Sequence, residues 1–281
     1  MSSFDIEFAA VTDIGKIREK NEDNVLISSD LGLGVVADGM GGHSAGEIAS
    51  NIAVSVLAET IRKINTNQLK IPENFLPKLD LTERKLLMAA NLANAAIYST
   101  AQSSDIYRMM GTTLTGILFD GDFATAVHVG DSRLYLFRDK KIVQITTDHS
   151  LAMEHVRRGL LTRAEADHSK IQNVLTRAMG IKKNIEFDLL KFPVKIGDTL
   201  LLCSDGLYKG LSENDMGDIL RKGNQLPIVK LCKQLVRVSN DKDGQDNISA
   251  VLIKILPAHK PTFKQRPKLR LPSVFPWRCQ E

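Results

Sequence analysis

What this 281-residue chain lacks already narrows its class. Its three cysteines, Cys203, Cys232 and Cys279, are odd in number and have neither zinc-ligand nor redox-motif spacing, which favours reduced thiols. The N-terminus has no basic segment followed by an apolar one, and no apolar run reaches transmembrane length. We therefore expect a cytoplasmic protein without a transmembrane segment.

The body of the chain also lacks a charge excess of either sign. Residues 257–281 contain six of the 37 Lys and Arg residues and one of the 33 acidic residues, so residues 1–256 carry a net charge of −1. A nearly neutral body gives no electrostatic argument for nucleic-acid binding. The segment 257–281 holds five of the nine prolines, so we expect one domain over 1–256 and a disordered basic tail that suits an acidic partner or surface.

The order of the expected elements defines the fold class. Alternating and apolar runs predict strands, and apolar residues at helical spacing predict helices. The expected strands are 4–12, 25–28, 33–37, 111–119, 123–129, 133–137, 142–145, 199–203 and 247–255, and the expected helices are 47–64, 82–101, 212–222 and 227–238. Because hairpin-like strands and helices follow one another without a βαβ alternation, we expect an α+β fold with antiparallel sheets.

The stretch from Val35 to His43 is the first that points to chemistry. A β-branched apolar run leads into Asp38, and a loop with three glycines then reaches the histidine. Ser44 and Glu47 follow with the spacing of a helix capping box. The pattern predicts a strand, a tight loop and a helix, with a carboxylate at the strand end and glycines that allow close backbone approach. Such a geometry suits a metal or a phosphate.

Acidic residues recur at other predicted strand ends. Asp131, Asp205 and Asp246 each lie close to a glycine beside an apolar run, and Glu22 and Asp23 form a further acidic pair. A single Asp-Gly pair is typical of a turn, but carboxylates gathered at one sheet edge repel one another unless cations neutralise them. Oxygen ligands without cysteine favour Mg²⁺ or Mn²⁺. Two such ions held close together can acidify a bridging water and hold a phosphoryl group for in-line attack.

Arg18, just before the acidic pair, has two interpretations. Its guanidinium suits bidentate binding of phosphate oxygens. It equally suits an exposed salt bridge to Glu19 or Glu22. The residues alone favour neither interpretation.

Six short motifs stand in order along nearly the whole body: Arg18-x-x-Asn21-Glu22-Asp23, Val36-Ala37-Asp38-Gly39-Met40-Gly41-Gly42-His43, Gly111-Thr112-Thr113, Val129-Gly130-Asp131-Ser132-Arg133, Ser204-Asp205-Gly206-Leu207 and Asp246-Asn247. Together they resemble the metal-dependent protein Ser/Thr phosphatases of the PPM (type 2C) family, in their compact bacterial form. The resemblance implies a sandwich of two antiparallel β-sheets flanked by helices, an α-β-β-α arrangement, with metals in a cleft at one end.

The resemblance implies how two metal ions are held. Asp38 matches the residue that bridges two Mn²⁺ or Mg²⁺ ions, and the main-chain carbonyl of Gly39 matches a ligand of one of them. Asp205 and Asp246 match the ligands of the other ion. These assignments follow from the motifs, residue by residue.

Four more residues acquire roles from the resemblance. Glu22 matches a metal ligand that acts through water, and Asp131 matches the ligand of a third, weaker ion. Asp23 matches an acceptor that orients waters on the metals. Arg18 matches the arginine that binds the phosphate, which places it with Asp38 among the catalytic residues.

His43 completes the predicted catalytic residues and has two interpretations. A histidine near this loop is proposed in the family to protonate the leaving alkoxide, which suits a group that titrates near neutrality. Animal members carry their histidine directly after Asp-Gly, where this chain has Met40. His43 therefore either takes this role from a shifted position or packs against the start of the following helix.

Residues 147–185 are polar, charged and helical, with Thr162 and Glu165 at capping-box spacing. This composition predicts an excursion from the sheet core, which the resemblance identifies as a flap beside the cleft. Its Arg157, Arg158 and Arg163 either read the phosphoprotein around the phosphate or form a solvated face.

The resemblance implies hydrolysis of phosphoserine and phosphothreonine in proteins by a metal-activated water, opposing a Ser/Thr kinase, in a monomer. No cysteine has an arginine six positions later, which excludes the cysteine-based phosphatase arrangement. The alternative is a catalytically silent regulatory binding module, but such a module is expected to lose metal-binding acids, and Asp38, Asp205 and Asp246 are present. A nucleic-acid or membrane-surface protein acting through its tail leaves these acids unexplained.

Overall fold

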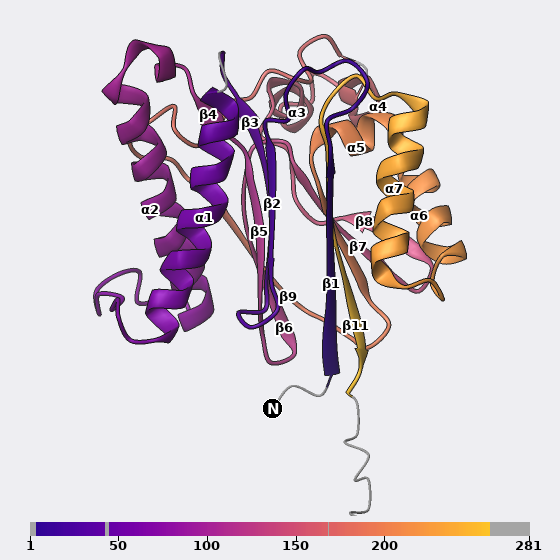
Figure 1. Cartoon of the computed structure of the whole chain (residues 1–281), viewed down its shortest axis with the longest axis horizontal. Helices are drawn as coiled ribbons and strands as arrows, with labels where there is room; N and C mark the ends of the chain where they lie inside the picture. Colours follow the sequence, from indigo (N-terminus) through magenta and orange to yellow (C-terminus); the bar gives the residue numbers. More distant parts are fainter. Residues whose placement is uncertain (1–3, 43–44, 168, 259–281) are drawn as a thin grey trace, which may run out of the picture.

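Two antiparallel sheets packed face to face form the centre of the molecule, and helices lie on both outer sides (Figure 1). The computed structural model describes residues 4–42, 45–167 and 169–258. The α-β-β-α arrangement confirms the expected fold class. Within these residues, no helix has both the length and the apolar character needed to cross a bilayer.

The two sheets are built from strands that lie far apart in the sequence. The first sheet has the order β1–β11–β10–β7–β8, with β1 (Phe4–Asp13), β11 (Ile248–Pro257), β10 (Thr199–Cys203), β7 (Arg133–Arg138) and β8 (Lys141–Gln144). The second sheet has the order β2–β3–β5–β6–β9, and the short β4 pairs with β3. Its strands are β2 (Asp23–Ser28), β3 (Leu33–Met40), β4 (Gly111–Thr112), β5 (Leu114–Asp120), β6 (Phe123–Val129) and β9 (Asp188–Pro193).

Each sheet carries its own group of helices (Figure 1). The second sheet is covered by α1 (Ala45–Asn65) and α2 (Leu81–Ser103), and the first by α5 (Asp205–Gly210), α6 (Glu213–Lys222) and α7 (Ile228–Lys242). Between β8 and β9 the chain forms α3 (Leu151–Arg157) and α4 (Arg163–Asp167), and the 3₁₀ helix η1 (Asp105–Tyr107) follows α2. The segment 147–185 is thus an excursion with short helices, as expected.

Neighbouring residues of the central strands pack into different layers, because successive side chains of a strand point to opposite faces. Val36 of β3 and Leu202 of β10 lie in the core between the sheets. Val35 packs on the side of α1 and α2, and Leu201 packs on the side of α6 and α7. Both strands are therefore buried on both faces, which explains why their sequences are continuously apolar.

Most predicted elements are confirmed within a few residues. The hairpin of β2 and β3 is present, and a two-residue turn joins β5 to β6, with Asp120 opposite Phe123. The predicted capping pair is also present, since the Thr162 main-chain N–H donates to Glu165 Oε2 over 2.7 Å. Ser44 of the other expected capping box lies outside the described residues.

Three features of the fold were not expected from the sequence. The predicted strand 111–119 divides at Thr113, because the main chain of this residue turns to donate a hydrogen bond to the Asp38 carbonyl. The helix α5 has only 6 residues, too few to show helical periodicity. The strand β9 lies at the edge of its sheet with partly exposed side chains, so it lacks a clear apolar pattern.

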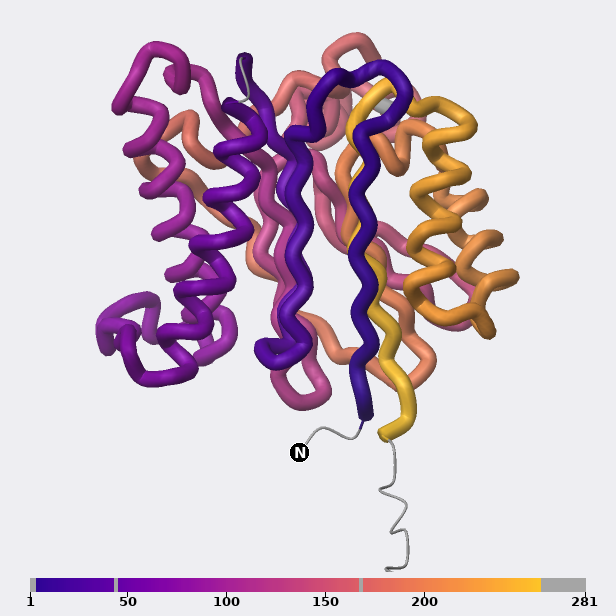
Figure 2. The backbone as a smooth tube through the Cα atoms, viewed as in Figure 1, coloured from indigo at the N-terminus to yellow at the C-terminus, as the bar shows by residue number. Residues whose placement is uncertain are grey.

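Connections from both sheets gather at one end of the sandwich (Figure 2). They include the β1–β2 loop, the end of β3, the start of α5 and the segment between α7 and β11. The start of β1 and the end of β11 lie at the opposite end, where Phe4 pairs with Pro257. The predicted tail therefore follows the last strand directly, although residues 259–281 lie outside the described part of the chain.

The start of α5 is packed directly on the main chain at the start of β11. A Cβ atom added to Gly206 would lie 2.1 Å from the carbonyl oxygen of Asn247. Ser204 donates its main-chain N–H to Ser249 over 3.1 Å, and the Ser239 hydroxyl donates to the Gly206 carbonyl over 2.9 Å. These contacts hold the start of α5, which carries Asp205, next to the segment before β11, which carries Asp246.

Gly206→Ala is expected to lower the free energy of unfolding by about 1–3 kcal/mol, because the Asn247 carbonyl must move to admit the methyl group. Gly217→Ala in α6 is the matched control, since its added Cβ would lie 3.5 Å from Ile142 Cγ2, an ordinary contact. There the helix preference of alanine should stabilise the protein by about 0.5–1 kcal/mol. Urea unfolding measures both changes, and a Gly206→Ala protein as stable as the wild type contradicts the close packing.

Candidate active site

Residues singled out in the sequence line one cleft at the end of the sandwich where the connections gather. The cleft has a volume of about 870 Å³ and is lined by Arg18, Glu22, Asp38, Gly39, Asp131, Asp205 and Asp246, among others. Asp23 of β2 pairs with Asp38 of β3 and accepts a hydrogen bond from Ser204 Oγ over 2.7 Å. His43 lies outside the described residues, so its two interpretations stay predictions.

The main chain of Asp38 is fixed by two threonines. Its N–H donates to Thr113 Oγ1, and its carbonyl accepts from both the Thr113 N–H and the Thr112 hydroxyl, each over 2.9 Å. These hydrogen bonds fix the main chain of Asp38 and do not involve its carboxylate. They give a role to the two threonines of the Gly-Thr-Thr motif, to which the sequence alone assigned none.

Gly39 lies where the chain leaves β3, and no larger residue fits there. An added Cβ would lie 2.2 Å from the Gly46 carbonyl oxygen and 2.5 Å from that of Glu22. The Gly39 N–H donates to the same Glu22 carbonyl over 3.1 Å. The glycine thus brings the Glu22 segment, β3 and the start of α1 together at the cleft.

Asn247 organises the loop that carries Arg18 and Glu22. Its Oδ1 accepts a hydrogen bond from the Glu22 main-chain N–H over 2.8 Å. Its Nδ2 donates to the carbonyls of Ile14 and Lys20, both over 2.9 Å. In the sequence Asn247 is part of a motif, but no role could be assigned to it. The three-dimensional contacts show that its side chain holds the β1–β2 loop against the start of β11.

The acids of the cleft are buried together without enough positive charge. Burial, and then the carboxylates of Asp23, Asp205, Asp131 and Asp246, raise the pKa of Asp38 well above its usual range. Burial is also the main cause that raises the pKa of Asp23 to about 7 and that of Asp131 to about 8. The pKa of Asp205 is raised chiefly by burial too, and its Oδ1 atom is buried without a hydrogen-bond partner.

Two side-chain cations face this acidic cluster. Arg18 Nη2 lies 2.9 Å from Asp246 Oδ1, and Lys209 pairs with Asp205. One of the two interpretations of Arg18 was an exposed salt bridge to Glu19 or Glu22, whereas its ion pair is with Asp246, inside the cleft. The Arg18 side chain is 52% exposed, so its guanidinium also faces solvent. Lys209 was not singled out in the sequence, because a lysine four residues after an aspartate is an ordinary helical ion pair.

The donor set fits hard divalent cations in its chemistry. It consists of carboxylates and a main-chain carbonyl, and the unpartnered Asp205 Oδ1 and raised carboxyl pKa values indicate that positive charge is needed. As the side chains stand, no group of three acidic, His or Cys side chains in the described residues converges on a single point. Asp205 and Asp246 are turned toward Lys209 and Arg18, so binding an ion there requires these pairs to open.

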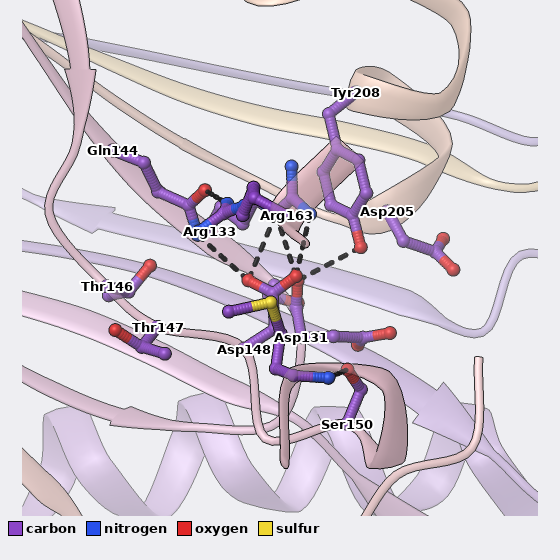
Figure 3. A network of polar contacts seen from close by, with 12 residues as sticks. Asp131, Arg133, Gln144, Thr146, Thr147, Asp148, Ser150, Arg163, Asp205 and Tyr208 are labelled. Carbon is purple, nitrogen blue, oxygen red and sulfur yellow. Dashed lines mark hydrogen bonds and ion pairs between the residues drawn. The ribbon is translucent and has the colours of Figure 1, made fainter. Parts of the chain in front are cut away.

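The loop that carries Asp131 is tied to the flap (Figure 3). Arg133 donates through Nη2 to Asp148 Oδ2 over 2.7 Å, and its guanidinium lies 3.6 Å from the centre of the Tyr208 ring. The Tyr208 hydroxyl donates to the main-chain carbonyl of Asp131 over 3.2 Å. The Gly130 N–H donates to His149 Nδ1 over 3.2 Å. The start of the flap, the Asp131 loop and α5 therefore form one connected network.

The flap arginines do not share one role. Arg157 and Arg158 are exposed and are absent from the lining of the cleft, as a solvated face requires. Arg163 instead hydrogen-bonds the Gln144 side chain and lines a second cavity beside the cleft. Arg177, which was not singled out, lines the cleft itself and pairs with Asp188 over 3.2 Å.

Comparison with known proteins agrees with this fold and cleft. The sequence profile of a family described as protein phosphatase 2C matches residues 18–253. The serine/threonine phosphatase Stp of Listeria welshimeri is 35% identical over 246 residues, which cover 86% of this chain and 93% of Stp. The crystal structure of the serine/threonine phosphatase PstP/Ppp of Mycobacterium tuberculosis has a TM-score of 0.77 at 33% identity, covering 90% and 99% of the two chains.

A further PstP structure, of the catalytic domain in complex with two manganese ions, has a TM-score of 0.75 at 32% identity and covers 90% of this chain and 99% of that one. Fold and cleft define a metal-dependent phosphatase domain. The chain belongs to the protein phosphatase 2C (PPM) family, and the resemblance of its motifs is thereby confirmed.

Asp38→Asn is expected to stabilise the metal-free protein by about 1–3 kcal/mol, because a neutral amide removes one of several buried like charges. In urea unfolding with EDTA the variant should be more stable than the wild type, and it should lose the stabilisation that Mn²⁺ gives the wild type. Asp218→Asn, which changes an exposed acid paired with Arg221, is the control and should change neither quantity. A less stable Asp38→Asn protein in EDTA contradicts the repulsion described here.

Proposed function

We propose that this chain hydrolyses phosphoserine and phosphothreonine in proteins and that it needs Mn²⁺ or Mg²⁺ to do so. The single observation that carries the proposal is the meeting of Asp38, Asp131, Asp205 and Asp246 with Arg18 in one cleft. Membership of the protein phosphatase 2C family and the names of its bacterial relatives support the same activity.

The proposed ligands follow the family pattern. Asp38 is assigned to both ions, the Gly39 carbonyl and Glu22 to the first, with Glu22 acting through water, and Asp205 and Asp246 to the second. When bound, the ions supply Lewis-acid activation of a water for attack on phosphorus. The oxygen-only donor set supports hard divalent ions, and the PstP structure with two manganese ions supports their number.

Other residues of the chain bind and orient. Arg18 is proposed to bind the non-bridging phosphate oxygens, which suits its half-exposed guanidinium at the cleft. Asp23, held by Ser204, is proposed to orient water at the site. Asp131 is proposed as the ligand of a third, weaker ion, and His43 as the group that protonates the leaving alkoxide.

We further propose a cytoplasmic monomer that opposes a Ser/Thr kinase. Reduced thiols support this location, since Cys203 and Cys232 are buried and free. The catalytic domain is assigned to 1–256 and the basic tail 257–281 to an acidic partner or surface, although the last strand, β11, extends one residue beyond this boundary to Pro257. A catalytically silent binding module is disfavoured, since such a module has no use for buried, mutually repelling acids.

Cleavage of an aryl phosphate tests the proposed activity. We expect turnover with Mn²⁺ or Mg²⁺ to fall by at least about 100-fold in EDTA and to return when the metal is restored, because the attacking water is activated by metal. A phosphoserine peptide should be cleaved under the same conditions. Undiminished activity in EDTA overturns the metal-dependent mechanism.

Arg18→Ala should raise the KM for an aryl phosphate about tenfold or more at saturating Mn²⁺, with a smaller change in kcat, because a charged hydrogen bond to the phosphate is lost. Arg221→Ala is the control, since Arg221 is half exposed on α6 and pairs with Asp218. Steady-state kinetics of both variants decide the point. An unchanged KM for Arg18→Ala contradicts phosphate binding by Arg18 and assigns it only the salt bridge to Asp246.

A further inference from the structure

Lys209 is a charged side chain inside the acidic cleft to which the proposed mechanism gives no role. It lies one helical turn after Asp205 in α5 and pairs with the Asp205 carboxylate. Its Nζ also lies 3.9 Å from Asp246 Oδ2. The ammonium is thus placed between the two carboxylates that are assigned to the second metal ion.

The burial of Lys209 distinguishes it from Arg18, the other cation paired with the acidic cluster. Its side chain is 26% exposed, whereas that of Arg18 is 52% exposed. The partner Asp205 is only 11% exposed, so water screens this ion pair weakly. Removal of one partner therefore costs more than it does in a surface salt bridge, because it leaves the other charge buried without compensation, and a divalent ion that binds Asp205 must compete with Lys209.

A second position is open to the Lys209 ammonium. The side chain lines the cleft and also an adjoining cavity of about 780 Å³. The wall of the adjoining cavity contains two further acids, Glu213 at the start of α6 and Asp243 at the end of α7. It also contains three arginines that already have side-chain partners: Arg18 bonds to Asp246, Arg133 to Asp148 and Arg163 to Gln144. A lysine stem is flexible enough to turn its charge from one cavity to the other, so Glu213 and Asp243 can accept the ammonium when it leaves Asp205.

We infer that Lys209 is a built-in counter-ion that neutralises Asp205 in the metal-free protein and is displaced into the adjoining cavity when a divalent ion binds. This inference rests on the proposed metal site. It makes Lys209 a positioning residue that sets how much Mn²⁺ or Mg²⁺ the enzyme needs. Its ammonium also offsets part of the repulsion among the buried acids before an ion binds.

The inference predicts opposite effects on metal affinity and on metal-free stability. Lys209→Met keeps an unbranched, flexible side chain that is one atom shorter and removes the charge. Its affinity for Mn²⁺ should rise about tenfold or more, because no ammonium competes for Asp205. The metal-free variant should unfold at lower urea concentration than the wild type, since Asp205 loses its counter-charge, and saturating Mn²⁺ should restore more stability than it does in the wild type.

The experiment is isothermal titration of the chelator-treated full chain with Mn²⁺ alone, accompanied by urea unfolding with and without Mn²⁺. Lys209→Arg keeps the positive charge and should bind Mn²⁺ with an affinity within about threefold of the wild type. Lys242→Met removes an exposed ion pair with Asp215 and should leave Mn²⁺ binding unchanged. Should Lys209→Met not fold without metal, Lys209→Gln keeps a hydrogen-bond donor for Asp205 and is expected to show the same rise in affinity.

The outcomes separate the inference from the proposed function. Unchanged or weaker Mn²⁺ binding by Lys209→Met and Lys209→Gln, with normal binding by the wild type, shows a merely structural lysine and overturns the inference alone. Absence of Mn²⁺ binding in the wild type and in every variant overturns the proposed metal site, and the inference with it. Tighter binding together with lower metal-free stability is the result that supports a displaced counter-ion.

Discussion

Carboxylates of like charge, buried together at one end of the sandwich, are the constraint on which the rest of this structure depends. Asp23, Asp38, Asp131 and Asp205 all have pKa values raised first by burial and further by neighbouring carboxylates. Such a cluster opposes folding, because each charge loses its hydration and repels the others. The three layers of apolar core must therefore hold together a site that is unfavourable by itself. The protein is therefore less stable than it would be without these acids, which the proposed metal site requires.

The acids stay together because polar bonds join the two sheets at the cleft. Ser204, at the end of β10 in the first sheet, donates to Asp23 of β2 in the second sheet and accepts from the Ser249 N–H of β11. Asn247 connects the start of β11 with the β1–β2 loop through Glu22. A shift of one sheet against the other would break these bonds, so the packing of the sandwich and the spacing of the acids are determined together.

The sequence predicted the fold well where a pattern has a local cause. Hairpins and long helices follow from periodicity, and acids beside glycines at strand ends correctly indicated the cleft. The short α5 and the edge strand β9 carry too few patterned residues to be predicted. Site features that depend on distant contacts have no sequence pattern either, such as the Arg18–Asp246 pair and the three side-chain hydrogen bonds of Asn247. The position of Lys209 beside Asp246 likewise depends on how α5 packs against β11.

The flap and the acidic cluster meet in α5. Tyr208 of this helix stacks on Arg133, which is held by Asp148 at the start of the flap (Figure 3). The next residue, Lys209, pairs with Asp205 at the first turn of the same helix. A displacement of the flap that moves Asp148 therefore acts on the helix that carries both an assigned metal ligand and its counter-ion. The position of the flap and the charge balance in the cleft are consequently connected through one 6-residue helix.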